Sequence, residues 1–193
     1  SGLRAEIHML SFLDRNILVT GGGSGIGKAT ALLLGMQKAS VVIVDQNRET
    51  AHRTVDELKQ LGCRASAVVA DISNPDAVEQ MYADTMENYE TLDGIVHCAG
   101  IGVERTILET TREEWDRIIA VNLSGTFFCA QGAAKIMAKQ RYGRIVLMGS
   151  AAGERGGTGR TAYGASKGGV SAITRVMAVE LAELGITVNA LAP

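Results

Sequence analysis

The chain has 193 residues, of which 46% are hydrophobic and 21% are charged, and its net charge is −2. This length and apolar content suit one globular domain with a sizeable core. No apolar run approaches the ~18 residues that a membrane-spanning helix needs, and the basic residues form no stripe of the kind that binds nucleic acid. We therefore expect neither a membrane nor a nucleic acid as a partner.

The first residues contain no apolar segment typical of a secretory signal. We interpret residues 1–9 as a tag or disordered leader, with the native start at Met9, and residues 10–193 as a single domain. The cysteines are odd in number and lack the spacing of metal ligands, so we predict free thiols, a cytoplasmic protein and no metal site. They are Cys63, Cys98 and Cys129.

Short β-branched runs alternate with longer amphipathic segments along the chain. This alternation predicts an α/β fold, a doubly wound parallel sheet with helices on both faces and the usual strand order 3-2-1-4-5-6. The strands are expected at 16–20, 41–45, 65–70, 93–98, 143–149 and 186–191. The helices are expected at 25–37, 47–61, 75–89, 112–138 (with an interruption left open) and 161–184. Asn74-Pro75 and Thr111-x-x-Glu114 are typical helix starts.

A glycine-rich segment, TGGGSGIG from Thr20 to Gly27, joins the first expected strand to the first expected helix. Strand, glycine turn and helix start are the context of a dinucleotide site, although the spacing is G-x-x-x-G-x-G. Glycines let the backbone approach a pyrophosphate, and the helix N-terminus favours its negative charge. The alternative of a flexible loop leaves the flanking strand and helix unexplained.

Asp45 ends the second expected strand, eighteen residues after Gly27. A carboxylate there can accept hydrogen bonds from the adenosine ribose and repels a 2′-phosphate. Ser24, inside the glycine turn, supplies no cation for such a phosphate. The pattern favours NAD over NADP, and Arg48 is the feature that speaks for NADP. The alternative role for Asp45 is the N-cap of the following helix.

Tyr163 and Lys167 are four residues apart, and Ser150 follows the fifth expected strand. Residues four apart share a helix face, with Cβ atoms roughly 5–6 Å apart, so the lysine can place its ammonium beside the phenol. A nearby positive charge lowers the pKa of a phenol and suits it to exchange a proton with an alcohol or ketone. Ser150 can donate a hydrogen bond to the same oxygen. The alternative is a surface tyrosine with a solvated lysine.

These motifs together resemble the short-chain dehydrogenase/reductase family. In its pattern Gly21, Ser24, Ile26 and Gly27 match the cofactor turn, which Gly25 completes, and the pair Asp71-Ile72 contacts the adenine. The resemblance further implies that Ala99 and Gly100 approach the cofactor and that Pro193 follows the last strand near the nicotinamide. It gives Asn122 a water-linked proton relay, and it has Tyr163 and Lys167 contact the cofactor as well as catalyse.

Two features depart from the family pattern. The family often has Asn-Asn-Ala-Gly where this chain has His97-Cys98-Ala99-Gly100. It also usually continues beyond Pro193 into a substrate loop and a final strand, which we expect to be absent from this chain. Since Ala99 and Gly100 keep the close backbone approach, we expect cofactor binding to survive.

The resemblance implies an NAD-dependent oxidoreductase that moves a hydride between nicotinamide and a secondary alcohol or ketone. The alternatives are an NADPH-dependent 3-oxoacyl-acyl-carrier-protein reductase and a non-enzymatic NAD-binding regulatory homologue. The resemblance also implies a homodimer or homotetramer that pairs through the helices at 112–138 and 161–184. The small residues expected at that interface are Gly164, Ala165, Gly168 and Gly169.

Overall fold

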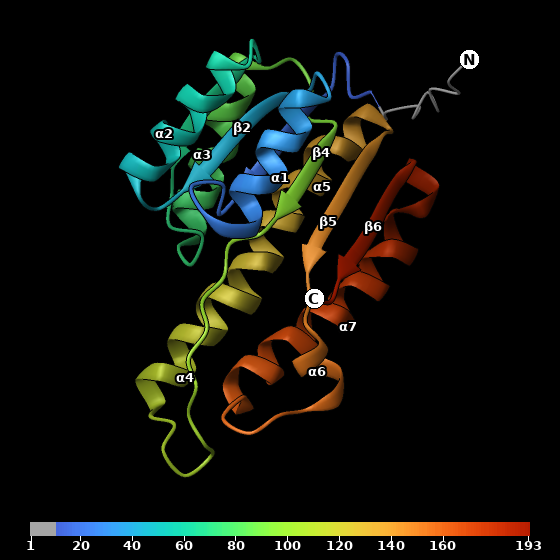
Figure 1. Ribbon diagram of the computed structural model, residues 1–193. Helices are drawn as coiled ribbons and strands as arrows, with labels where there is room; N and C mark the ends of the chain where they lie inside the picture. The colour runs from blue at the N-terminus through green and yellow to red at the C-terminus, as the bar shows by residue number, and fades with distance from the viewer. Residues whose placement is uncertain (1–10) are drawn as a thin grey trace, which may run out of the picture.

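The computed structural model describes residues 11–193, so the expected leader at 1–9, with Met9, lies outside the described residues. Six parallel strands form one sheet in the order β3-β2-β1-β4-β5-β6, as predicted (Figure 1). Every neighbouring pair of strands runs parallel, which requires a crossover between them. The strands are β1 Asn16–Thr20, β2 Ser40–Asp45, β3 Ala65–Val69, β4 Gly94–His97, β5 Gly143–Met148 and β6 Ile186–Leu191.

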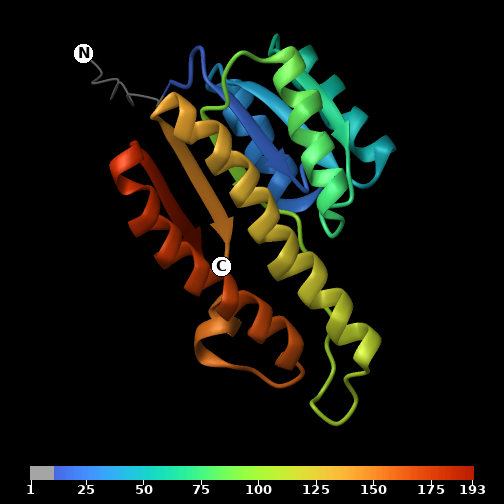
Figure 2. The ribbon, with the colours of Figure 1, turned by 180° about the vertical axis from the view of Figure 1, so that it is seen from behind.

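Helices cover both faces of the sheet (Figures 1 and 2). On one face lie α1 Gly25–Met36 and α2 Arg48–Gln60, and on the other lie α3 Pro75–Asn88, α5 Thr126–Gln140 and α7 Thr161–Leu181. Beyond the carboxyl ends of the strands extend α4 Arg112–Ile119, the π-helical segment η1 Ala120–Gly125 and α6 Ala151–Arg155, and a 3₁₀ turn, η2 Ala182–Leu184, follows α7.

The central strands are buried on both faces, as parallel strands usually are. In β1, Ile17 and Val19 pack toward α1 and α2, whereas Leu18, between them, packs toward α3 and α5. Side chains alternate across a strand, so a continuous apolar run supplies both cores at once. The outer strand differs, because exposed Thr187 separates buried Ile186 from Val188.

Several helix ends follow the predicted chemistry. The Asn74 side chain accepts a 2.9 Å hydrogen bond from the Asp76 N–H, with Pro75 in the first turn. Thr111 and Glu114 form a reciprocal capping box at the start of α4. The predicted helix 112–138 is interrupted by the π-helical segment, after which α5 continues to Gln140. Helix α6 was not predicted, because five residues show no helical periodicity.

Within residues 11–193, no helix is both long and apolar enough to cross a membrane. Cys63, Cys98 and Cys129 are all free thiols.

Candidate active site

The glycine turn and three strand ends enclose a cavity of about 640 Å³ at the carboxyl edge of the sheet. The parallel order brings the ends of β1, β2 and β4 together there, although they are far apart in sequence. The cavity is lined by these residues of the expected cofactor site: Gly21, Ser24, Gly25, Ile26, Gly27, Asp45, Asp71, Ile72, Ala99 and Gly100.

The turn is folded tightly against its neighbours. Gly21 has a φ of +64°, and a Cβ on it would lie 2.8 Å from the Ala99 nitrogen. A Cβ on Gly27 would lie 2.7 Å from the carbonyl carbon of Gly21. In contrast, a Cβ on Gly25 would meet nothing within 4 Å, and Ser24 makes no side-chain cap to α1. The first turn of α1 thus presents open backbone to the cavity, which fits a pyrophosphate.

The Asp45 carboxylate joins the glycine turn to the end of β2. One oxygen accepts a 3.0 Å hydrogen bond from the Gly23 N–H, and the other accepts a 3.0 Å bond from the Asn47 N–H. Asn47, not Asp45, caps α2, because its side chain accepts from the Thr50 N–H. The N-cap alternative for Asp45 is therefore wrong, and its half-buried carboxylate faces the cavity.

Asp71 and Ile72 follow β3 and line the same cavity. The Asp71 carboxylate accepts hydrogen bonds from the backbone N–H and the hydroxyl of Ser73, at 2.9 and 2.7 Å. Ile72 is buried, and a Cβ on Gly125 would lie 2.8 Å from its carbonyl oxygen. These contacts hold the loop after β3 against η1.

His97 and Cys98 stand where the family pattern has two asparagines, at the end of β4, and Cys98 lines both this cavity and the one that holds Ser150 and Tyr163. His97 is 1% exposed, and its Nδ1 lies 2.9 Å from the Thr20 hydroxyl. Burial, with a smaller contribution from the charge of Lys167, lowers the pKa of His97 to about 3. Burial raises the pKa of Cys98 to about 11, so this thiol stays protonated at neutral pH. The imidazole therefore connects β4 to β1 as a neutral group.

A second cavity, of about 300 Å³, adjoins the first. Both are lined by Ile26, Cys98, Gly100 and Ile101. The second cavity also gathers the expected catalytic residues Ser150, Tyr163 and Lys167, together with Pro193. A molecule lying along the first cavity therefore has access to these side chains.

Ser150 and Lys167 are held by the backbone around the end of β5. The Ser150 hydroxyl accepts a 3.2 Å hydrogen bond from the Ala152 N–H at the start of α6. Lys167, 5% exposed, donates a 2.7 Å hydrogen bond from Nζ to the Met148 carbonyl. Its Nζ lies 5.8 Å from the centre of the Tyr163 ring. The recorded hydrogen bond of the ammonium is thus to Met148, and burial lowers the pKa of Lys167.

Asn122 lines neither cavity. It is fully buried in η1, where its side chain forms 2.8 Å hydrogen bonds to both the N–H and the C=O of Ile101. A Cβ on Gly100 would lie 3.2 Å from Asn122 Oδ1 and 3.7 Å from Lys167 Nζ. Asn122 and Lys167 therefore both lie beside Gly100, where any other residue would carry a side chain.

Some lining residues were not predicted. Asp116 and Arg117 of α4 reach the first cavity, and Arg160 reaches the second. Arg160 could have been predicted, because it precedes Tyr163 by three residues and residues at this spacing share a helix face. No sequence signal marks Asp116 or Arg117, since only the path of the chain after β4 places them there.

Three of the glycines expected at a subunit interface also pack closely against other parts of the same chain. A Cβ on Gly169 would lie 2.7 Å from the Leu123 side chain in η1. A Cβ on Gly153 of α6 would lie 2.7 Å from the Gly168 nitrogen, and a Cβ on Gly164 would lie 3.0 Å from the Ala152 carbonyl oxygen. These glycines allow α6 and η1 to pack closely on α7.

Comparison with known proteins agrees with this geometry. A family model described as short chain dehydrogenase matches residues 15–193. The chain is 42% identical to (2S)-((R)-hydroxy(phenyl)methyl)succinyl-CoA dehydrogenase subunit BbsD from Thauera aromatica, over 93% of this chain and 72% of that protein. It is 41% identical to a 3-oxoacyl-acyl-carrier-protein reductase from Synechocystis, over 91% of this chain and 72% of that protein.

Solved structures agree as well. A crystal structure of NAD⁺-bound xylitol dehydrogenase superimposes with a TM-score of 0.92 at 32% identity, covering 94% of this chain and 70% of that one. The chain therefore belongs to the short-chain dehydrogenase family, whose members are oxidoreductases that use nicotinamide cofactors.

Proposed function

We propose that this chain is an NAD-dependent oxidoreductase that exchanges a hydride between nicotinamide and a secondary alcohol or its ketone. One observation carries the proposal. The cavity lined by the glycine turn and Asp45 adjoins the cavity that holds Ser150 and Tyr163. A dinucleotide held by the first would extend its reactive end toward the second.

The cofactor contacts follow from the cavity lining. In this proposal the turn of Gly21 and Ser24–Gly27 holds the pyrophosphate, and Asp45 holds the adenosine ribose. Asp71 and Ile72 contact the adenine, while Ala99 and Gly100 leave room for the rest of the cofactor. Pro193 lies at the nicotinamide end, where it lines the second cavity.

The proton steps belong to side chains of the second cavity, and a bound nicotinamide supplies the hydride chemistry. Tyr163 takes the proton of the substrate hydroxyl in oxidation and returns it in ketone reduction. Ser150 donates a hydrogen bond to the same oxygen, because its Oγ already accepts from Ala152 and keeps its own hydrogen to donate. Lys167 adds positive charge and contacts the nicotinamide ribose, and Asn122 orders the proton relay.

The choice of NAD rests on Asp45. Its carboxylate lines the cavity, hydrogen-bonded to Gly23, and would face the 2′-phosphate of NADP. The runner-up is an NADPH-dependent 3-oxoacyl-acyl-carrier-protein reductase. Its support is the 41% identity to a reductase with that substrate, together with Arg48 three residues past Asp45.

Titration with NADH and with NADPH, followed by cofactor fluorescence, tests the cofactor choice. Tenfold tighter binding of NADH, about 1.4 kcal/mol, supports the role of Asp45. Tighter binding of NADPH favours the reductase and makes Arg48 the residue to vary. If the protein binds neither NADH nor NADPH, the proposal is contradicted.

The catalytic role is tested separately with Tyr163→Phe, which removes only the hydroxyl. We expect turnover of secondary alcohols to be abolished while NADH binds nearly as before. Residual turnover above about 10⁻² of the wild-type rate would rule out Tyr163 as the acid/base, since such groups contribute about 10²–10⁴-fold. Cofactor binding by a wild-type protein without any turnover would favour a regulatory homologue.

We also propose that the chain forms a homodimer or homotetramer. Large apolar side chains are exposed on α5 and α7, namely Phe127, Val176 and Val179. A second copy of the chain would cover them. Light scattering of Val179→Glu, which puts a charge on this face, should show a smaller species than wild type, and an unchanged mass would exclude this face as the interface.

A further inference from the structure

The catalytic cavity has an uneven charge. Two cationic side chains line it, Arg160 and Lys167, and the described lining residues include no aspartate or glutamate. Lys167 donates its recorded hydrogen bond to the Met148 carbonyl, inside the protein. The guanidinium of Arg160 lies over the other side of the site, with its Cζ 5.7 Å from the centre of the Tyr163 ring. The charged side chains that line this cavity are therefore both cationic, and the carboxylate paired with Arg160, that of Glu104, lies outside the lining.

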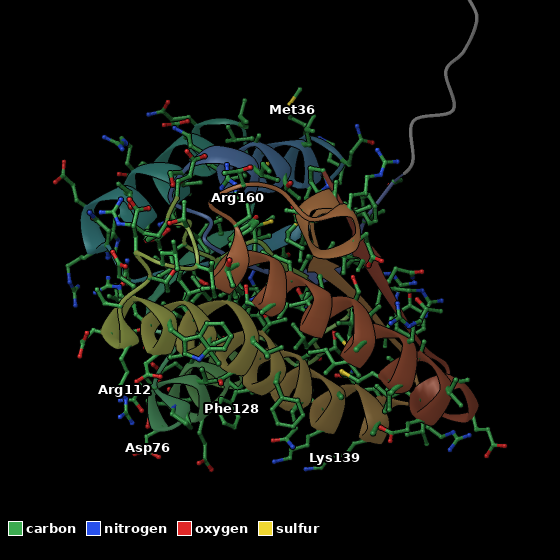
Figure 3. All side chains as sticks on the ribbon, turned by 90° about the horizontal axis from the view of Figure 1, so that it is seen from below. Met36, Asp76, Arg112, Phe128, Lys139 and Arg160 are labelled. Carbon is green, nitrogen blue, oxygen red and sulfur yellow. The ribbon has the colours of Figure 1, made fainter. Side chains whose placement is uncertain are left out.

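Arg160 is fixed in position by its backbone. Its N–H donates a 3.2 Å hydrogen bond to the Gly157 carbonyl, and its carbonyl accepts one from the Gly164 N–H in the first turn of α7. It also forms a parallel bridge with Arg105, in the segment after β4. Figure 3 looks at the molecule from below, and Arg160 lies near the centre of that view. These bonds fix the backbone of Arg160, while its side chain contacts Glu104 and the Tyr163 ring.

The guanidinium has donors to spare. Nη2 of Arg160 is paired with Oε1 of Glu104, a side chain that is itself 72% exposed. A guanidinium offers five N–H donors in a planar fork and often holds a carboxylate through two of them. The pair with Glu104 uses one nitrogen of Arg160, so the remaining N–H groups can donate to a second anion. Because Glu104 is exposed to solvent, its own pairing adds little to stability and yields readily to a competitor.

We propose that the substrate is a hydroxy acid, oxidised to its keto acid, whose carboxylate binds Arg160 while the reacting oxygen lies between Ser150 and Tyr163. This inference rests on the proposed function. In the oxidation the alcohol carbon gives a hydride to NAD⁺ and the hydroxyl gives its proton to Tyr163. The carboxylate takes no part in the chemistry and only orients the reacting carbon.

Calorimetry on the NAD⁺-saturated protein tests this without turnover, because NAD⁺ cannot reduce a ketone. The probes are acetoacetate and methyl acetoacetate, which differ by the charge. We expect acetoacetate to bind at least tenfold more tightly. Arg160→Gln should remove that preference, whereas Arg105→Gln should keep it. Arg105 is the matched control, since it is paired with Glu114 and does not line this cavity.

Glu104→Gln provides a second variant that leaves Arg160 in place. Removing the competing carboxylate should tighten acetoacetate binding and leave the ester unchanged. The inference is overturned if the two probes bind equally or if acetoacetate does not bind. It is also overturned if the preference for acetoacetate survives in Arg160→Gln. The NAD⁺ titration that precedes the probes reports on the proposed function itself, and its failure would overturn both.

Discussion

The hydroxyl of Thr20 and Nδ1 of His97 lie 2.9 Å apart at the ends of β1 and β4, where both side chains are buried. The same hydroxyl accepts a 3.2 Å hydrogen bond from the Ala99 N–H. Which of the two groups donates depends on the tautomer of the imidazole, whose buried Nε2 has no hydrogen-bond partner among the described residues. One threonine thus connects the glycine turn to the loop that both cavities share.

Replacing Thr20 by valine should therefore destabilise the protein. The change keeps the shape but removes the partner of the Ala99 N–H and of His97, and a buried group without a partner costs about 1–3 kcal/mol. Urea unfolding would measure the loss, with Thr187→Val as control because Thr187 is exposed on β6. A Thr20→Val protein as stable as wild type would show that the two hydrogen bonds contribute little.

His97 should make stability depend on pH. Burial lowers its pKa from the ordinary value of 6.5 to about 3 in the folded protein, so between these pH values only the unfolded chain binds the proton. The free energy of unfolding therefore rises with pH through this window, by up to about 1.4 kcal/mol per pH unit. The contribution of His97 to stability is correspondingly lost as the pH falls below about 6.5. His97→Asn should flatten this slope in urea unfolding measured at several pH values.

His52→Asn is the matched control for the pH experiment, because His52 is exposed on α2. The slope should persist in this variant. A slope that survives in His97→Asn would assign the pH dependence to other groups.

Asp45→Asn should weaken the preference for NADH over NADPH. The amide oxygen can still accept from the Gly23 N–H, so the turn keeps its hydrogen bond, but the charge facing a 2′-phosphate is gone. We expect the ratio of the two dissociation constants to shift by tenfold or more toward NADPH. Glu49→Gln removes an exposed charge near the start of α2 and should leave the ratio unchanged.

Gly27→Ala should damage the cofactor turn. The new Cβ would meet backbone atoms of Gly21 and Gly22, at 2.7 Å from the Gly21 carbonyl carbon, and backbone cannot move aside as a flexible side chain can. We expect a tenfold or greater loss of NADH affinity and a lower melting temperature. Gly102→Ala is the control, since a Cβ there meets nothing within 4 Å. Normal affinity in Gly27→Ala would mean that the turn has more room than the structure records.

Much of the fold follows from local patterns in the chain. The runs at 16–20 and 186–191 form strands with the predicted bounds, because β-branched apolar residues bounded by polar ones identify buried strands well. The caps at Asn74 and Thr111 were also predicted, since they depend on neighbours within three residues. Helix α6 and the π-helical segment were not, because one short turn or one extra residue leaves no periodic signal.

For the candidate site, too, some features could be predicted from the sequence and others could not. The spacing of the motifs predicted many of the residues that line the two cavities, but not the contacts those residues make. The ammonium of Lys167 binds the carbonyl of Met148, and any residue type at 148 offers that carbonyl. The glycines of α7 show a related limit, because small residues indicate close packing without saying against which element. Their partners, Leu123 and α6, come from tertiary structure.

The π-helical segment determines how α4 is rotated about the helix axis relative to α5. Helix α5 packs in the core, whereas α4, before the segment, brings Asp116 and Arg117 to the first cavity. Each residue of an α-helix advances the chain by about 100°. Deleting a single residue within Ala120–Gly125 would convert the wide turn to an ordinary one and rotate all of α4 by about that angle relative to α5. The additional residue thus sets the rotation of α4 relative to α5, so that α5 faces the core while α4 faces the cavity lined by the glycine turn.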